Sequence, residues 1–328
     1  MQRRLVPTTW LPALLMLTAA VLFLSLAVGS TAVPLHGLWD ALTGGGDALT
    51  RTVVLELRLP RTLNAFAVGG LLALAGTLMQ VLLRNPLADP YILGVSGGAA
   101  VGALGALLLG LAGLWVNGGA FLGSLVSTLI VFALAHGRGG WTPTRLLLTG
   151  IAVAAGWGAA ISLMLVLGSD ASLHSMLFWL MGDFSYQPGS SLALLVLAAG
   201  LLLSWPFARQ LNVLARGETL AEALGVPVRP LTLAIYIGAS LFTAVAVTEA
   251  GAIGFVGLVV PHMFRLAAGG DHRRLLPGAA LLGGCLLVLA DTLARSVAAP
   301  RQLPVGVVTA ALGVPLFLYL LNRARGPL

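Results

Sequence analysis

Asp291 and Arg295 are ionisable residues inside an apolar segment, "LADTLAR" (residues 289–295). Residues four apart lie on one face of a helix, where opposite charges pair. A lone charge inside a bilayer is costly, so an intramembrane carboxylate has a partner or carries a function such as proton relay. The spacing favours an Asp291–Arg295 ion pair. The alternative is an ion-coupled secondary transporter that uses Asp291.

Potential metal ligands are scattered along the chain rather than grouped in a motif. A zinc site brings Cys, His or carboxylate ligands together, often at short sequence spacings. The histidines and the single cysteine show no such pattern, and one cysteine forms no disulfide within a chain. We predict no metal site. These residues are His36, His136, His174, His262, His272 and Cys285.

The chain also lacks a P-loop for ATP hydrolysis. All 18 basic residues are arginine, whereas the P-loop motif G-x-x-x-x-G-K-[ST] requires a lysine. The glycine-rich stretch "GVSGG" (94–98) is therefore not expected to cradle phosphate. The apolar segments also contain no convergent polar groups of the kind a catalytic site needs. We expect a protein that is not an enzyme and carries no cofactor.

A short acidic helix is predicted within "ARGETLAEALGVPVRP" (215–230). Glu218 and Glu222 lie four apart among good helix formers, and Gly225 and Pro227 would end the helix. Its other face consists of Leu220, Ala221 and Leu224. Such an amphipathic helix fits a groove on a soluble partner. A helix lying on the membrane would instead favour Lys and Arg on its polar face.

The stretch "RNPLADP" (84–90) predicts a stiff turn between two apolar segments. Each of its two prolines fixes φ and removes a backbone donor. Asn85 and Asp89 are residue types that cap helix ends.

Composition assigns the chain to the membrane. It is 58% hydrophobic and 9% charged, with a mean hydropathy of +0.99, whereas soluble domains carry about 25% charged residues. The N-terminal apolar run reads as a retained helix rather than a signal peptide. We predict an all-α polytopic fold in one domain (1–328). Its ten membrane-spanning segments are 11–29, 62–83, 92–114, 119–136, 145–168, 190–207, 231–248, 252–268, 276–298 and 304–321.

The arginines orient these segments. An even number of spans places both termini on one side of the membrane, and most arginines then lie in loops on that side. The positive-inside rule makes it the cytoplasmic side. The net charge of +7 is thereby explained without nucleic acid. The exceptions predicted to lie outside are Arg51, Arg58, Arg61, Arg295 and Arg301.

Several stretches resemble the FecCD-type permeases, which are membrane subunits of type II ABC importers for vitamin B12, iron-siderophores and haem. The resemblance runs from about residue 50 to 321. It is carried by "RLPRTLNAFAVGGLLALAGTLMQVLLRNPLADPYILGVSGGAAVGA" (58–103), "LARGETLAEALGVPV" (214–228), "GAIGFVGLVVPHMFRLAAGGDHRRLLPGAALLGG" (251–284) and "LPVGVVTAALGVPLFLYLL" (303–321).

The resemblance implies a type II ABC importer permease fold and a homodimer in the bacterial inner membrane. It implies two copies of a cytoplasmic ABC ATPase, which bind ATP and Mg²⁺, and a periplasmic or lipid-anchored binding protein. Residues 213–227 would form the coupling helices that contact the ATPase. The coupling residues would be Glu218, Ala221, Glu222, Leu224 and Gly225.

The resemblance also assigns two other sets of residues. Docking of the binding protein falls to Arg58 and Arg61, with Arg295 or Arg301. The inner gate consists of Asn85 and Leu87 with Pro143 and Thr144, although Pro143 departs from the polar residue expected there. The expected cargo is a bulky iron chelate, haem or a corrinoid. The permeases for these three substrates share the motifs quoted above, so the resemblance does not choose among them.

Overall fold

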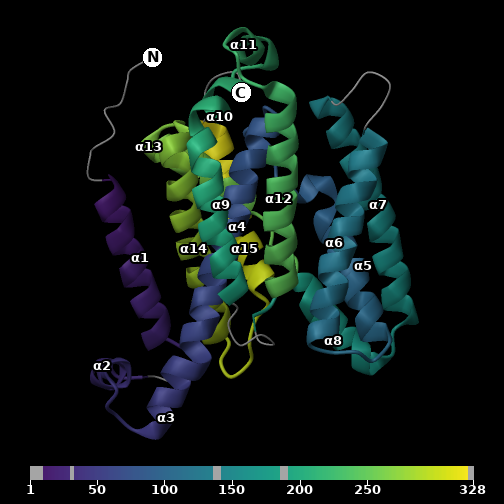
Figure 1. Cartoon of the computed structure of the whole chain (residues 1–328). Coiled ribbons are helices and arrows are strands. Elements are labelled where there is room, and N and C mark those ends of the chain that lie inside the picture. The colour runs from purple at the N-terminus through teal and green to yellow at the C-terminus, as the bar shows by residue number, and fades with distance from the viewer. Residues whose placement is uncertain (1–9, 30–32, 136–141, 185–190, 324–328) are drawn as a thin grey trace.

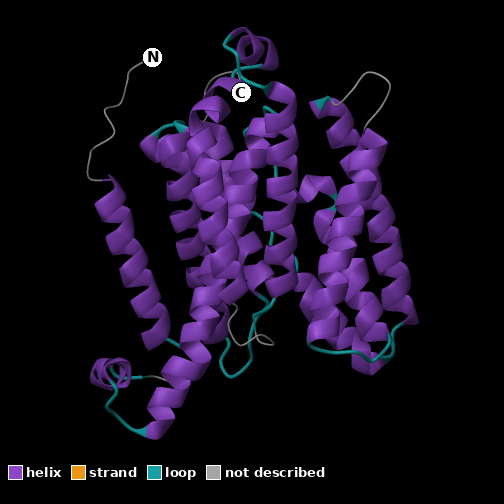
Figure 2. Cartoon of the chain, in the orientation of Figure 1, coloured by secondary structure: helices purple, strands orange, loops and turns teal. Residues whose placement is uncertain are grey.

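The computed structural model describes residues 10–29, 33–135, 142–184 and 191–323, and these fold into a bundle of helices (Figures 1 and 2). No strand occurs in these ranges. Ten helices form the bundle. They are α1 (Trp10–Ala27), α4 (Leu59–Leu82), α5 (Val95–Leu108), α6 (Leu114–Ala135), α7 (Pro143–Leu167), α9 (Ser191–Ser204), α12 (Val228–Ala250), α13 (Val256–Ala268), α14 (His272–Ser296) and α15 (Val305–Arg323).

Short helices connect the long ones. They are α2 (Leu35–Thr43), α3 (Ala48–Arg51), the π-helical turn η1 (Thr52–Arg58), the 3-10 turns η2 (Pro90–Leu93) and η3 (Trp205–Phe207), α8 (Asp170–Met181), α10 (Ala208–Leu214) and α11 (Glu218–Ala223). Each of the ten predicted spans corresponds to one of the ten bundle helices. By length and composition, seven helical segments of the described chain suffice to cross a membrane, and α5, α13 and α15 are shorter apolar helices.

The second predicted span begins earlier than expected. Residues 48–82 form one continuous helical run of 35 residues, because α3 and η1 lead directly into α4. Pro60 lies within this run, directly after the π-helical turn η1, and the helix continues through it.

The bundle has two distinct ends. α1 begins and α15 ends at the end that carries α11, which we call the α11 end, while α2, α3 and α8 lie at the opposite end, the α2–α3 end (Figure 1). Arginines are more numerous at the α11 end of the described chain, at positions 84, 145, 209, 216, 229, 265, 273, 274 and 323. Those at the α2–α3 end are 51, 58, 61, 295 and 301.

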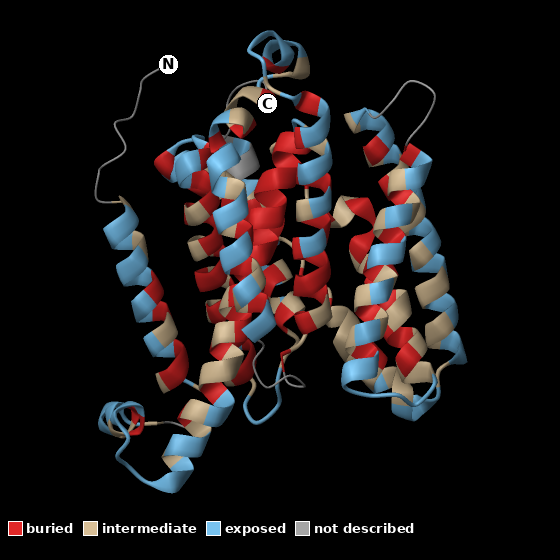
Figure 3. Cartoon of the chain, viewed as in Figure 1, coloured by how far each residue is buried: buried red, intermediate tan, exposed pale blue. Residues whose placement is uncertain are grey.

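α4 is the central helix of the bundle. It packs against α12, α13, α14, α9 and α1, and almost all of its residues are buried (Figure 3). Helices approach closely in lipid where small residues meet. A Cβ built on Gly76 of α4 would lie 1.9 Å from the carbonyl oxygen of Gly257 in α13. Glycines thus let the backbones of α4 and α13 meet at the centre of the bundle.

We expect Gly76→Ala to destabilise the protein by about 1–3 kcal/mol, because the new methyl group meets rigid backbone. Thermal unfolding of the purified protein in detergent measures the loss. The matched control is Gly158→Ala in α7, where a Cβ meets nothing within 4 Å and the better helix former is neutral or stabilising. Equal melting temperatures for the two variants would contradict this account of the packing.

Residues 251–255 are non-helical backbone inside the bundle, between α12 and α13. Non-helical backbone at membrane depth must be buried in protein and have its polar groups satisfied. The Tyr91 hydroxyl donates to the Ile253 carbonyl (2.9 Å) and accepts from the Ile253 N–H (3.0 Å). The eighth predicted span, 252–268, is therefore helical only from Val256.

Candidate functional site

The predicted acidic helix exists as α11 and ends as expected. Gly225 adopts a left-handed conformation with φ 75°. The N–H of Val226 donates to the Ala221 carbonyl (2.9 Å), and that of Gly225 donates to the Glu222 carbonyl (2.9 Å). This pair of bonds is the Schellman motif, which satisfies the last carbonyls of a helix. α11 is therefore a short, firmly terminated helix beyond the end of the bundle (Figure 1).

α11 exposes apolar side chains. Leu224 is 63% exposed and Leu220 is also exposed, whereas Ala221 is 0% exposed and joins the main core with residues of α10 and α12. Ala221 therefore fixes α11 to the bundle in this conformation, and its predicted contact with a partner stays a prediction. The outward surface of α11 consists of Leu220, Glu222, Ala223 and Leu224.

A polar cluster fastens α10, which precedes α11, to the start of α14. The Asn212 amide donates to the Asp271 carboxylate (2.8 Å), and its oxygen accepts from the backbone N–H of His272 (2.9 Å). Burial by itself would raise the pKa of Asp271. The hydrogen bonds from Asn212 and from the Arg273 N–H outweigh it, so the pKa lies below the usual value. The charged carboxylate therefore caps α14.

The predicted stiff turn is held by its own polar groups. The Asn85 side chain accepts from the Leu87 N–H (2.9 Å), and the Asp89 side chain accepts from the Tyr91 N–H (2.8 Å). The Gln80 amide, on α4, reaches the carbonyl of Ala88 (3.4 Å) and accepts a hydrogen bond from Arg265 of α13. We call residues 84–90 the gate loop. It is tied to α4 and through Gln80 to α13.

The other two predicted gate residues lie at the start of α7. Pro143 occupies the first position of the helix, and the Thr142 side chain caps it by accepting from the Arg145 N–H (3.3 Å). Thr144 is exposed. α7 meets the segment after the gate loop at η2, where a Cβ on Gly150 would lie 2.1 Å from the Ile92 carbonyl oxygen. The gate loop and α7 are thus mechanically joined through η2.

Asp291 is the centre of a buried charge cluster at the α2–α3 end. Arg61 donates to it from Nε (3.0 Å) and Nη2 (2.7 Å), and Arg295 Nε lies 3.6 Å away. Asp291 is 1% exposed. The predicted Asp291–Arg295 pair is present, but the main partner is Arg61 of α4. Hydroxyl groups of Ser25, Thr62 and Thr292 complete the cluster and join α1, α4 and α14.

Two of the predicted docking residues, Arg58 and Arg295, are buried in this conformation, and their docking role stays a prediction. Arg58 is 5% exposed and donates to the carbonyls of Leu26 (2.8 Å) and Ala27 (3.1 Å). Arg295 is also buried and donates to the Ser25 carbonyl. Their guanidinium groups hold the end of α1 instead of presenting a surface. Arg301 is exposed, and Arg61 lies at the rim, where it also donates to Gln302 (3.1 Å). Docking by these two stays a prediction.

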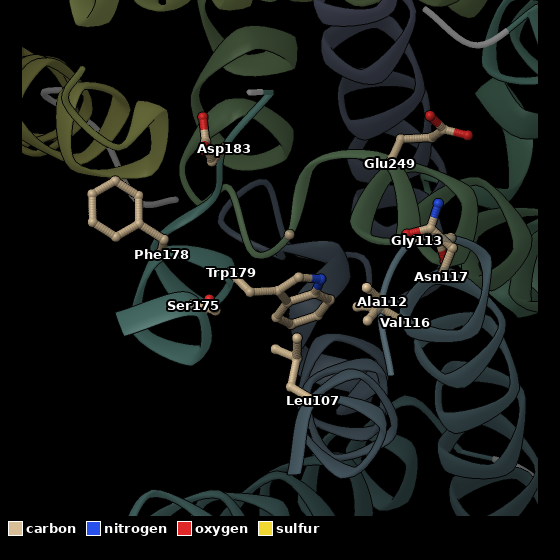
Figure 4. A pocket seen from close by; sticks show the side chains of 12 residues that line it. Leu107, Ala112, Gly113, Val116, Asn117, Ser175, Phe178, Trp179, Asp183 and Glu249 are labelled. Carbon is tan, nitrogen blue, oxygen red and sulfur yellow. The ribbon is translucent and has the colours of Figure 1, made fainter. Parts of the chain in front are cut away.

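A pocket of about 220 Å³ lies at the α2–α3 end between α5, α6, α8 and α12 (Figure 4). The Trp179 indole stands in the middle of its lining, with Glu249 and Asn117 on one side and Asp183 and Phe178 on the other. Glu249 is buried and accepts from the Asn64 amide (3.3 Å). Sequence reasoning missed this pocket.

Within the described part of the chain, no three His, Cys, Asp or Glu side chains gather into a group that would hold a metal ion. The ordered polar groups instead form the Asn212 cluster, the gate loop and the Asp291 cluster. The first two lie at the α11 end and the third at the α2–α3 end.

Comparison with known proteins places this architecture in a family. The chain is 42% identical to the hemin transport system permease protein HmuU of Yersinia pestis, over 99% of this chain and 98% of that protein. It is 43% identical to the cobalamin import system permease protein BtuC of Halobacterium salinarum, over 87% and 79%. A solved structure described as an inward-facing conformation of a metal-chelate type ABC transporter matches with a TM-score of 0.84 and 30% identity, over 95% and 98%.

The family model agrees with these likenesses. It covers residues 17–323 and therefore includes α11, the gate loop and the Asp291 cluster. With ten long helices in the bundle and relatives that match along nearly their whole length, the chain is a multi-pass transport permease that belongs to the FecCD transport family.

Proposed function

We propose that this chain is the membrane permease of an ATP-driven importer for a bulky iron chelate, haem or vitamin B12. The observation that carries the proposal is α11, which projects beyond the bundle and exposes Leu220 and Leu224. Exposed apolar side chains rimmed by charge mark interaction sites. Relatives named as hemin and cobalamin permeases support the cargo class.

The partner at α11 is a cytoplasmic ABC ATPase, one copy for each permease, and it binds the ATP and Mg²⁺ that drive transport. The α11 surface offers two leucines beside Glu222, which suits a groove with an apolar floor and a basic rim. The arginine excess at the α11 end supports a cytoplasmic position for this end and for both termini. The permease then lies in the bacterial inner membrane.

The functional unit is a homodimer with the cargo path between its subunits. α7 is the least buried of the candidate spans, and α15 also exposes apolar side chains, including Leu312 and Leu318. Both helices therefore have surface to offer to lipid and to a second copy. A periplasmic or lipid-anchored binding protein docks at the α2–α3 end, where Arg61 and Arg301 present positive charge to an acidic surface.

The rival function is ion-coupled secondary transport through Asp291. A proton relay needs a carboxylate that exchanges its proton. Asp291 is instead buried, and its carboxylate is engaged by the guanidinium groups of Arg61 and Arg295. The geometry therefore favours an ATP-driven importer.

Uptake by proteoliposomes decides between the two functions. The permease is purified with whatever ATPase accompanies it and reconstituted with the binding protein from the same operon, with cyanocobalamin and hemin as probes. We expect uptake of one probe to require ATP and to survive a protonophore. Uptake that proceeds without ATP and stops with the protonophore would overturn the proposal in favour of secondary transport.

A further inference from the structure

Arg84 occupies an unusual backbone position at the end of α4. Its φ is +49°, one of two positive values among the described non-glycine residues. The N–H of Asn85 donates to the Gln80 carbonyl (3.2 Å), and that of Arg84 donates to the Val81 carbonyl (3.2 Å). The end of α4 is thus a Schellman motif whose left-handed residue is Arg84, a position that glycine usually fills.

α11 ends in the same motif, and there the left-handed residue is Gly225. An L-residue with a side chain pays a conformational cost in this region that glycine avoids. Strained backbone tends to mark sites where the side chain has a task. Because glycine would fit the end of α4 at a lower conformational cost, we expect the Arg84 side chain to have a task of its own.

The Arg84 side chain reaches α11. Its Nη2 lies 3.4 Å from Oε1 of Glu218, and both side chains are partly exposed. α11 otherwise packs against α10 and the start of α12. The ion pair therefore joins the first residue of the gate loop directly to the first residue of α11.

The gate loop is built to move as one piece. Asn85 and Asp89 close its turns, and Gln80 holds the Ala88 carbonyl. A displacement of Arg84 is thus passed to Leu87 rather than absorbed by loose chain. A partly exposed ion pair adds little stability, so its value here is the mechanical link.

We propose that Arg84 is a positioning residue that couples α11 to the gate loop through Glu218, so that movement of the ATPase is transmitted to the gate. This inference rests on the proposed function. It adds a direct side-chain contact between the two sites to the indirect path through α12, which packs against both α11 and η2.

The test measures access to the gate loop in the permease–ATPase complex in nanodiscs. A cysteine replaces Leu87 in a Cys285→Ala background, and its labelling rate with a charged maleimide is compared without nucleotide and with ATP plus vanadate. We expect Arg84→Glu and Glu218→Arg each to reduce the nucleotide-dependent change in rate by roughly two- to fivefold. The double charge swap should restore it.

The matched control places the second substitution one helical turn further along α11, at Glu222 instead of Glu218. Arg84→Glu combined with Glu222→Arg has the same net charge and alters the same helix, but the structure shows Arg84 paired with Glu218 rather than Glu222. Because Glu222 belongs to the α11 surface proposed for the ATPase, Glu222→Arg alone sets the baseline, and the combination should show no recovery relative to it. Recovery equal to that of the Glu218 swap would mean that overall charge, and not the pair, governs the gate, and the proposal would fail.

Arg84→Gly separates the coupling role from a structural one and leaves α11 intact. It removes the conformational cost, so its melting temperature should equal or exceed that of the parent, while the nucleotide response falls like that of Arg84→Glu. A lower melting temperature with a parental nucleotide response would show a merely structural arginine. If no ATPase accompanies the parent protein, both the proposed function and the Arg84–Glu218 link are overturned. If the ATPase binds and Arg84→Gly leaves the nucleotide response unchanged, only the link is overturned.

Discussion

Leu220→Asp combined with Leu224→Asp is expected to abolish co-purification of the ATPase. Both leucines are exposed on α11, with Leu224 at 63%, and burial of one leucine in a partner groove contributes about 1.5–3 kcal/mol. Loss of both, with two charges placed in an apolar groove, lowers affinity by at least about a hundredfold. Quantitative mass spectrometry of the purified complex measures the ATPase retained for each permease.

The control for this variant is Leu49→Asp. Leu49 is also an exposed leucine on a short helix, α3, but it lies at the α2–α3 end. The Leu49→Asp variant should retain the ATPase fully. Because Leu220 and Leu224 are already in contact with solvent, the double variant Leu220→Asp with Leu224→Asp should unfold at the parental temperature. Full retention of the ATPase by the double variant would show that α11 is not its binding site.

Asp291→Ala is expected to lower the free energy of unfolding by about 3–5 kcal/mol, the largest stability effect predicted for this chain. The carboxylate is 1% exposed and neutralises Arg61, with Arg295 close by. Its removal leaves two guanidinium groups without their counter-charge in a largely dry environment. The cluster also joins α1, α4 and α14, so the loss should appear as an early thermal transition in detergent.

Two comparison variants make this prediction specific. Asp47→Ala removes an exposed carboxylate that caps α3 and should lower the melting temperature far less than Asp291→Ala does. Arg61→Met with Asp291→Leu removes both main partners and should recover part of the stability, because replacing a buried pair is far less costly than breaking it. If Asp291→Ala unfolds at the same temperature as Asp47→Ala, the cluster is not the stabilising element described here.

Features that depend on neighbours in the chain were predictable. A helix that crosses a bilayer must satisfy its own backbone, so each apolar run of sufficient length becomes a helix. The ten long helices follow from that constraint. The end of α11 at Gly225 and the pairing of Asp291 with Arg295 follow from residues within one or two turns of each other.

Features that depend on distant contacts were decided only by the tertiary structure. Arg61, the main partner of Asp291, lies 230 residues away in the chain, and Arg58 is buried because the end of α1 passes over it. The sequence pattern places Ala221 on the apolar face of a short helix, but in the structure α10 and α12 pack over its side chain. The link from Arg84 to Glu218 belongs to the same class. Sequence spacing reports which residues share a helix face, but only packing decides which faces and loops meet.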